Sequence, residues 1–145
     1  MGSKLIKTGV LHFLRGLAIW IVSSSVFAGS LSGMFRTETN DEGGYLHVEM
    51  VPCESDAKKA CGLINKAFNV NEGPDPILDY EHLGKLIVWD MKDQGDGSWS
   101  KGKIWAPDDD KTYKSKMEIN ASGDVLTVEG CVLFICRGQD WKRLE

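Results

Sequence analysis

Hydrophobic and polar residues alternate along the segment from Ser98 to Ile119, and this pattern predicts a β-hairpin. In its second half, one face collects Tyr113, Ser115, Met117 and Ile119, and the other collects Thr112, Lys114, Lys116 and Glu118. A period of two is typical of a strand with one buried face and one solvated face. Pro107 and the acidic run Asp108–Asp110 predict the turn, because proline fixes φ early in a turn and aspartate bonds its own backbone.

The rest of the chain after residue 30 repeats this unit. Predicted strands cover Gly33–Glu38, Tyr45–Val51, Cys61–Phe68, Lys85–Lys92, the two arms of Ser98–Ile119, Val125–Gly130 and Cys136–Arg143. Turn signals rich in glycine, asparagine and aspartate separate most of them. This rhythm predicts an all-β fold, a small antiparallel up-and-down β-barrel of about eight strands, because closure leaves no edge strand exposed.

Three segments depart from the simple alternation. Asn69–Gly84 is the longest irregular stretch, and it is either a functional loop such as a lid or a plain crossover with a helical turn at Ile77–His82. Lys85–Lys92 is apolar on both faces, which an outer cover formed by that long loop would explain. Val132–Ile135 is a short apolar tip that leads to the last strand.

Residues 1–28 have the composition of a processing segment. Basic residues come first and no acidic residue is present; an apolar run follows from Leu17 to Ala28, and Val26 and Ala28 are small residues two apart. This layout predicts a secretory signal peptide cleaved after Ala28, with residues 29–145 forming a single barrel domain. The alternative is an uncleaved anchor, but the run contains three serines and is shorter than the roughly 20 apolar residues of a span.

The charge of the chain narrows the choice of partners. Its formal charge is −4, and cleavage after Ala28 would remove three basic residues and no acidic one, which leaves −7. Because no basic run is present, we expect no nucleic-acid partner. An acidic exported domain suits a soluble protein, so we expect a periplasmic or secreted location and no stable membrane insertion after cleavage.

Four cysteines lie in two local pairs after residue 28. Exported compartments favour disulfides, and four cysteines allow three connectivities. Proximity favours Cys53–Cys61 and Cys131–Cys136, each of which would close a connection between antiparallel strands. Neither pair has CxxC spacing, and after residue 28 only His47 and His82 could add nitrogen ligands. We therefore expect no metal site, no redox-active pair and no cofactor.

Several motifs together are similar to a known family. They are Trp99–Gly102, Pro107–Tyr113, Val128–Cys131, Gly138–Arg143, Pro52-Cys53 and Cys61-Gly62. On these residues the chain resembles the bacterial family called domain of unknown function 2147, whose members usually carry a signal peptide. The resemblance implies a lipocalin-like barrel and an exported protein; the family has no established biochemical activity.

The lipocalin-like class implies one further contact. In that class a Gly-x-Trp motif opens the first strand, and a basic residue late in the chain packs across the tryptophan. Here Gly33-Met34-Phe35 stands in that place, and Arg143 or Arg137 would stack on Phe35. Asp110 departs from the family pattern, because it replaces the glycine of the hairpin turn.

Three functions fit this picture. The first is a carrier that binds a small apolar or amphipathic ligand in a sealed cavity of roughly 300 Å³ or more, with Tyr113, Met117 and Trp141 as barrel-facing candidates. The alternative is a structural or interaction protein of the bacterial envelope, with a filled core and outer apolar faces at Lys85–Met91 and Val132–Ile135. The third is an enzyme using His82 or Asp79 in the long loop. We expect no enzyme, because no nucleophile with its base is found.

Overall fold

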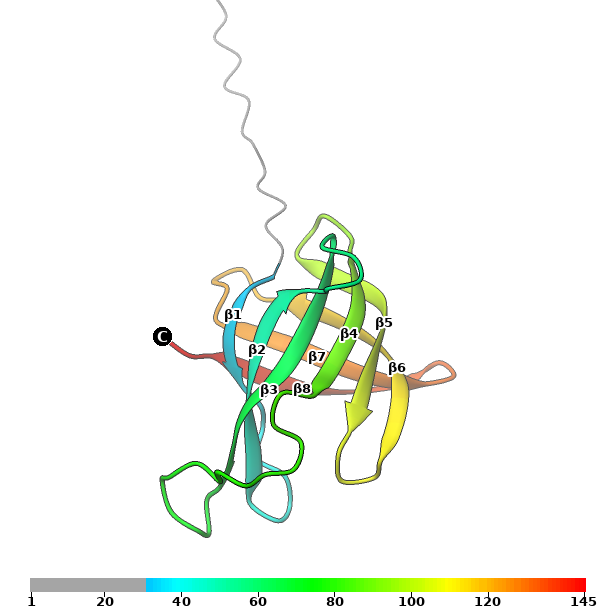
Figure 1. Cartoon of the computed structure of the whole chain (residues 1–145). Helices are drawn as coiled ribbons and strands as arrows, with labels where there is room; N and C mark the ends of the chain where they lie inside the picture. Colours follow the sequence, from blue (N-terminus) through cyan, green and yellow to red (C-terminus); the bar gives the residue numbers. More distant parts are fainter. Residues whose placement is uncertain (1–30) are drawn as a thin grey trace, which may run out of the picture.

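Eight antiparallel strands close into one barrel, as the alternation predicts (Figure 1). A computed structural model describes residues 31–145; the predicted signal peptide and its cleavage after Ala28 lie outside the described residues. The strands are β1 (Gly33–Arg36), β2 (Gly44–Pro52), β3 (Lys59–Asn69), β4 (Leu86–Asp93), β5 (Ser98–Ala106), β6 (Lys111–Ile119), β7 (Val125–Val132) and β8 (Ile135–Arg143).

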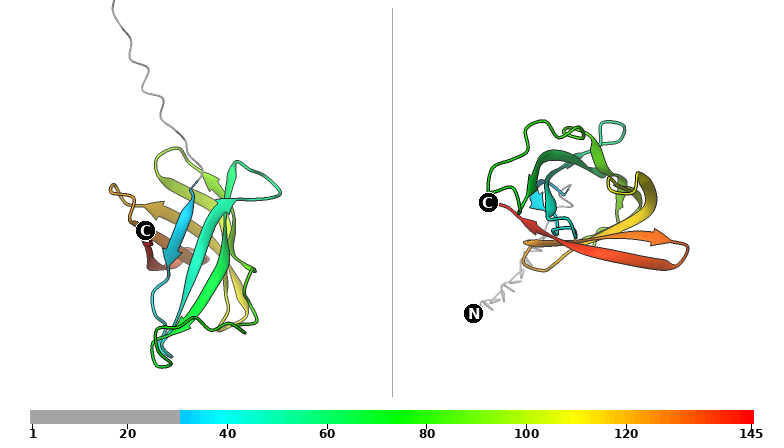
Figure 2. Two further views of the ribbon diagram at one scale, coloured as in Figure 1. Left: turned by 60° about the vertical axis from the view of Figure 1, so that its left-hand side comes forward. Right: turned by 90° about the horizontal axis from the view of Figure 1, so that it is seen from below.

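Each strand pairs with its neighbours in sequence, and β1 pairs with β8 to complete the ring (Figure 2). This order places alternate turns at opposite ends. The β1–β2, β3–β4, β5–β6 and β7–β8 connections share one end, which we call the mouth. The β2–β3, β4–β5 and β6–β7 turns share the other, which we call the closed end. In Figure 1 the mouth faces down, and the β7–β8 hairpin projects sideways.

The interior toward the closed end is filled by side chains. The largest fully buried ones are Phe35, Val48, Met50, Ile64, Val88, Met91, Leu126, Val128 and Trp141. Gly62 shows how tight this packing is, because a Cβ there would lie 2.7 Å from Val88 Cγ2 and 2.9 Å from Met50 Sδ. Dense packing of this kind leaves no room for a ligand in the closed half of the barrel.

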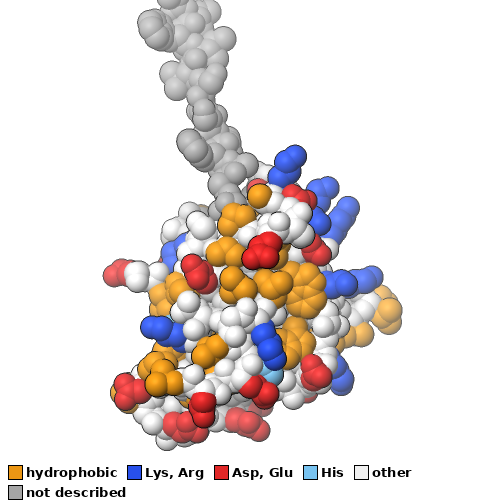
Figure 3. Space-filling model, viewed as in Figure 1, with side chains coloured by type: hydrophobic (Ala, Val, Ile, Leu, Met, Phe, Trp, Pro, Cys, Tyr) orange, Lys and Arg blue, Asp and Glu red, His pale blue; other side chains and the backbone are white. Residues whose placement is uncertain are grey.

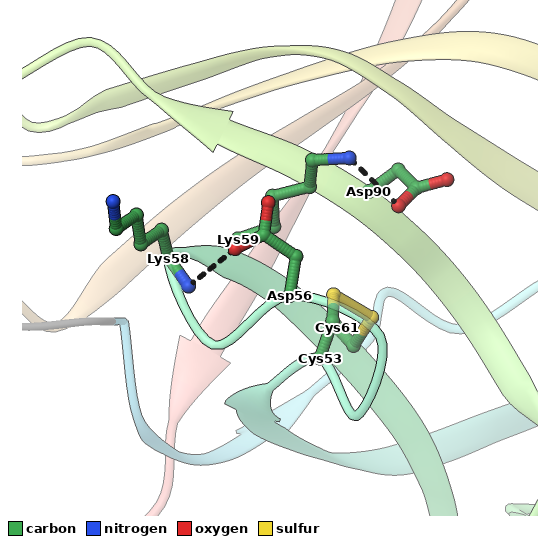
Figure 4. A network of polar contacts seen from close by, with 6 residues as sticks. All are labelled: Cys53, Asp56, Lys58, Lys59, Cys61 and Asp90. Carbon is green, nitrogen blue, oxygen red and sulfur yellow. Dashed lines mark hydrogen bonds and ion pairs between the residues drawn. A yellow bond between two sulfur atoms is a disulfide. The ribbon is translucent and has the colours of Figure 1, made fainter.

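A disulfide and an ion pair stabilise the closed end (Figure 4). Cys53 and Cys61 are both buried and joined across the β2–β3 turn, with Cα atoms 5.0 Å apart. Lys59 Nζ lies 3.3 Å from Asp90 Oδ1 on β4. The second disulfide, Cys131–Cys136, joins β7 to β8 at the other end of the barrel. Both cysteine pairings expected from proximity are present.

The interpretation of the long β3–β4 loop and of β4 needs correction. Residues 70–85 form turns without a helix, and they do not cover the outer face of β4. Ile87, Val88 and Met91 are buried, whereas Leu86 is 42% exposed. Leu86 and Trp89 line a shallow depression beside the Cys53–Cys61 disulfide. Hydrophobic side chains are accordingly visible on the outer surface over β3 to β5 (Figure 3).

Candidate functional site

A cavity of about 280 Å³ lies inside the mouth of the barrel and opens to solvent. Its apolar walls come from five strands and the long loop: Leu46, Ala67, Ile77, Ile87, Ile104, Trp105 and Trp141. The carrier hypothesis predicts a sealed cavity; this one is open, because the core fills only the closed half. A concave apolar site with a few polar groups at its rim is typical of small-ligand sites.

The β3–β4 loop forms one wall of this cavity. The Ile77 amide donates to the Ala67 carbonyl at 2.8 Å, which fastens the loop to β3. Farther along, the Tyr80 ring packs edge-on against His82, with centroids 5.1 Å apart. The His82 ring in turn packs edge-on against Trp105 of β5 at 4.8 Å. The loop is therefore attached to strands on both sides of β4, and it extends the barrel wall beyond the start of β4.

A hydrogen bond joins two loops across the mouth. Asn40 Nδ2, in the β1–β2 loop, donates to Asp108 Oδ2, in the β5–β6 turn, at 3.1 Å. Asn40 is itself held in place, because its Oδ1 accepts from the Gly44 amide at 2.7 Å. Both residues line the cavity. Their contact therefore narrows the opening from two opposite sides.

The polar part of the lining is acidic. Its two charged members are Glu38 and Asp108, and its uncharged polar members are Thr37, Asn40, Tyr45, Asn69, Tyr80 and Gln139. Of the described residues that line the cavity, none is lysine, arginine or histidine. Burial raises the pKa of the Tyr80 hydroxyl, and the nearby charges of Asp108 and Glu81 raise that pKa further. The opening thus favours a neutral or positively charged group over an anion.

The residues proposed from sequence occupy different places. Trp141 lines the cavity, and its Nε1 donates to Gln139 Oε1 at 3.2 Å. Met117 is buried in the core, and Tyr113 is half-buried and does not line the cavity. His82 supports the wall from outside and Asp79 is exposed; neither lines the cavity.

The polar residues at the opening of the cavity, which form its rim, were not predicted from the sequence. Asn40 and Asp108 are 68 residues apart, and each reads as an ordinary turn residue in its own segment. Tyr80 sits in a stretch without periodicity, and only the unusual length of that loop signalled it.

The described part of the chain offers no other obvious site for chemistry. Across residues 31–145, no three side chains among His, Cys, Asp and Glu come together as a metal-binding group. The same residues contain no helix that is long and apolar enough to cross a membrane.

A closed eight-stranded antiparallel barrel with a cavity at one end defines a lipocalin-like protein. The chain belongs to the family described as uncharacterised proteins conserved in bacteria (DUF2147), whose model matches residues 33–143. The match spans all eight strands, from the first residue of β1 to the last of β8.

A solved structure has the same architecture. Protein HP1028 from the human pathogen Helicobacter pylori, described as belonging to the lipocalin family, is similar with a TM-score of 0.61 and 20% sequence identity. The similarity covers 79% of this chain and 83% of that chain. At this identity the likeness establishes the fold. No curated protein matches the chain.

Proposed function

We propose that this protein is an exported bacterial carrier that binds a small apolar or amphipathic molecule in the mouth of its barrel. The observation that carries the proposal is the cavity of about 280 Å³, whose walls are apolar and whose rim is polar. An eight-stranded barrel is just wide enough to hold one small ligand. The ligand's apolar part would contact Leu46, Ile104 and Trp141, and its polar part would remain at the rim.

Export is the second part of the proposal. The two disulfides support it, because such bonds persist in oxidising compartments. The arrangement of residues 1–28 as basic residues followed by an apolar run also supports it. The intact mass of protein recovered from the periplasm tests this part directly, since cleavage after Ala28 removes a defined mass.

Native mass spectrometry of protein purified from the periplasm tests the carrier function. We expect an additional mass that dissociates on mild activation. The variant Leu46→Trp places a large side chain in the cavity, so it should lose the additional mass. Glu49→Trp is the matched control, because Glu49 lies exposed on the outer face of the same strand; this variant should keep the additional mass.

Two results would contradict the carrier proposal. One is a bare chain that also fails to bind fluorescent fatty-acid and retinoid probes. The other is a bound mass that persists in a folded Leu46→Trp variant. The first result would favour the alternative, an envelope interaction protein whose barrel holds no ligand, and the second would place the bound molecule outside the cavity.

A further inference from the structure

Four consecutive apolar residues are exposed at the end of the β7–β8 hairpin. Val132, Leu133, Phe134 and Ile135, which we call the apolar tip, are 58%, 86%, 90% and 65% exposed. The hairpin projects from the body of the barrel (Figure 1), and a hydrophobic protrusion is visible there in the space-filling view (Figure 3). Isolated exposed apolar residues are common, but a contiguous group typically forms a contact site.

The sequence of the tip is poorly suited to the turn that it forms. Leu133 has a φ of 55°, in the left-handed region that two-residue hairpin turns usually fill with asparagine or glycine. A large apolar residue in this region is strained. The Cys131–Cys136 disulfide lies directly below and holds the two strands together. The tip is therefore a rigid projection that presents apolar side chains at a cost in backbone energy.

Four lysines lie beside the base of the tip. Lys101, Lys103, Lys114 and Lys116 line one shallow surface depression together with Cys131; we call them the lysine patch. Lys114 is the direct cross-strand partner of Cys131, and it is also the direct partner of Lys103. Like charges placed opposite each other destabilise a sheet, so folding alone does not favour this arrangement.

The lysine patch is largely available for an external partner. Lys116 forms an ion pair with Glu129 at 3.1 Å. Among the described residues the other three lysines form no ion pair. This positive region contrasts with the formal charge of −4 for the whole chain, and it adjoins the most exposed apolar residues of the hairpin.

We propose that the apolar tip and the lysine patch form a docking site for an anionic phospholipid bilayer. The leucine and phenylalanine side chains would enter the boundary between headgroups and acyl chains, and the lysines would contact the phosphates. Only four residues would enter the bilayer, so the protein would bind reversibly and would not span it. An apolar protrusion with cations beside its base matches the layers of a bilayer, in which apolar acyl chains lie beneath anionic phosphates. A protein partner would not require this arrangement.

Co-sedimentation with lipid vesicles tests the proposal. The protein is purified from the periplasm with both disulfides formed, and its intact mass is checked, because an uncleaved apolar leader would itself bind lipid. We expect binding to vesicles made of equal parts phosphatidylcholine and phosphatidylglycerol, and much weaker binding to phosphatidylcholine alone. Leu133→Ser/Phe134→Ser should reduce binding at least tenfold. Leu78→Ser is the matched control, because Leu78 is 84% exposed but lies in the long loop. This variant should bind the vesicles as the unmodified protein does.

A second pair of variants tests the electrostatic part. Lys103→Gln/Lys114→Gln should weaken binding to the mixed vesicles by about fivefold for each lysine. Lys58→Gln/Lys142→Gln removes two exposed lysines elsewhere and should have a much smaller effect. All these residues are exposed, so circular dichroism should show an unchanged fold.

Three results would overturn the proposal. The first is no binding to the mixed vesicles. The second is binding that survives Leu133→Ser/Phe134→Ser. The third is a concentration-dependent dimer in size-exclusion chromatography that this double variant converts to monomer, because the tip would then dock on a second copy of the chain.

Discussion

The guanidinium of Arg143 stacks on the ring of Phe35, with its central carbon 4.5 Å from the ring centroid. Arg143 also donates from Nη1 to the Ser32 carbonyl at 2.8 Å and from Nε to the Gly123 carbonyl at 2.6 Å. Phe35 is fully buried. Gly33 leaves the space that the guanidinium occupies, because a Cβ there would collide with Nη1. One side chain thus ties together β1, β8 and the β6–β7 turn.

We predict that Arg143→Ala destabilises the protein by about 2 kcal/mol, because it removes a cation–π contact and two charge-assisted hydrogen bonds at a partly exposed site. Urea unfolding measures this loss. Lys142→Ala is the control; it changes the neighbouring exposed residue and should alter stability by less than about 0.5 kcal/mol. Equal effects of the two variants would show that the stacked arginine contributes nothing specific.

The stability of the β5–β6 turn should depend on a side-chain oxygen at residue 110 that accepts a hydrogen bond. Asp110 has a φ of 50°, and its Oδ1 accepts from Trp105 Nε1 at 3.0 Å. Asp110→Asn keeps an acceptor and tolerates this φ, so we expect little change in unfolding free energy. Asp110→Ala loses the hydrogen bond and strains the turn, at a cost of about 1–2 kcal/mol. An alanine variant as stable as the asparagine variant would contradict this assignment.

His47 should make stability depend on pH. Burial lowers the pKa of its imidazole below 6.5, and the charges of Lys66 and Arg36 lower it further. The unfolded chain therefore binds a proton at a higher pH than the folded chain does. The contribution of this residue to stability is complete above the unfolded pKa and is lost as the pH falls through the lowered folded pKa.

Two measurements check this behaviour of His47. The urea midpoint should decrease as the pH is lowered from about 7.5 to about 5. The variant His47→Gln should make this decrease smaller. In an NMR titration, Lys66→Gln should raise the pKa of His47, because it removes a neighbouring positive charge. A His47 pKa at or above 6.5 in the unmodified protein would refute the prediction.

The two disulfides should contribute unequally. On loop entropy alone, each contributes about 2–3 kcal/mol, with slightly more for Cys53–Cys61, whose cysteines are eight residues apart rather than five. Cys53 and Cys61 are also buried, whereas Cys131 and Cys136 are half-buried. We expect Cys53→Ala/Cys61→Ala to lower the urea midpoint more than Cys131→Ala/Cys136→Ala. The opposite order would show that the tip disulfide supports more of the fold.

If the carrier proposal holds, the acidic rim should select the charge of the ligand. Octylamine and octanoate have the same apolar tail, and we expect the amine to bind at least about fivefold more tightly. Quenching of the fluorescence of Trp105 and Trp141, which line the cavity, reports binding. Asp108→Asn should reduce the preference, whereas Glu54→Gln, at the closed end, should not. Tighter binding of octanoate would contradict the role assigned to the rim.

Most of the strands were predictable because one face is solvated and the other is buried. In β6, buried Ser115 and Met117 alternate with exposed Lys114 and Lys116, so a local pattern is sufficient. The disulfides and the Phe35–Arg143 contact were predictable from proximity and from resemblance. β4 was harder to interpret, because Leu86 is exposed although it is apolar.

The position of the cavity at the mouth was not predictable, because hollow space depends on the summed volumes of side chains from distant strands. Gly62 and Gly102 allow Val88 and Met91 to fill the closed half, yet neither glycine is distinctive in its own segment. The rim contact between Asn40 and Asp108 likewise depends on where two separate turns end. Such contacts follow from the closed barrel, and no local pattern encodes them.

The order of the strands also has a consequence for how the chain folds. Seven of the strand pairings join sequence neighbours, so hairpins can form one after another with little loss of loop entropy. Only the β1–β8 pairing joins distant segments, Phe35 with Arg143 and Arg36 with Lys142. The ring therefore stays open until the last strand emerges during synthesis or export. Until then β1 and β7 are unpaired edges, and this interval is when the chain is most exposed to proteases and to association with other strands.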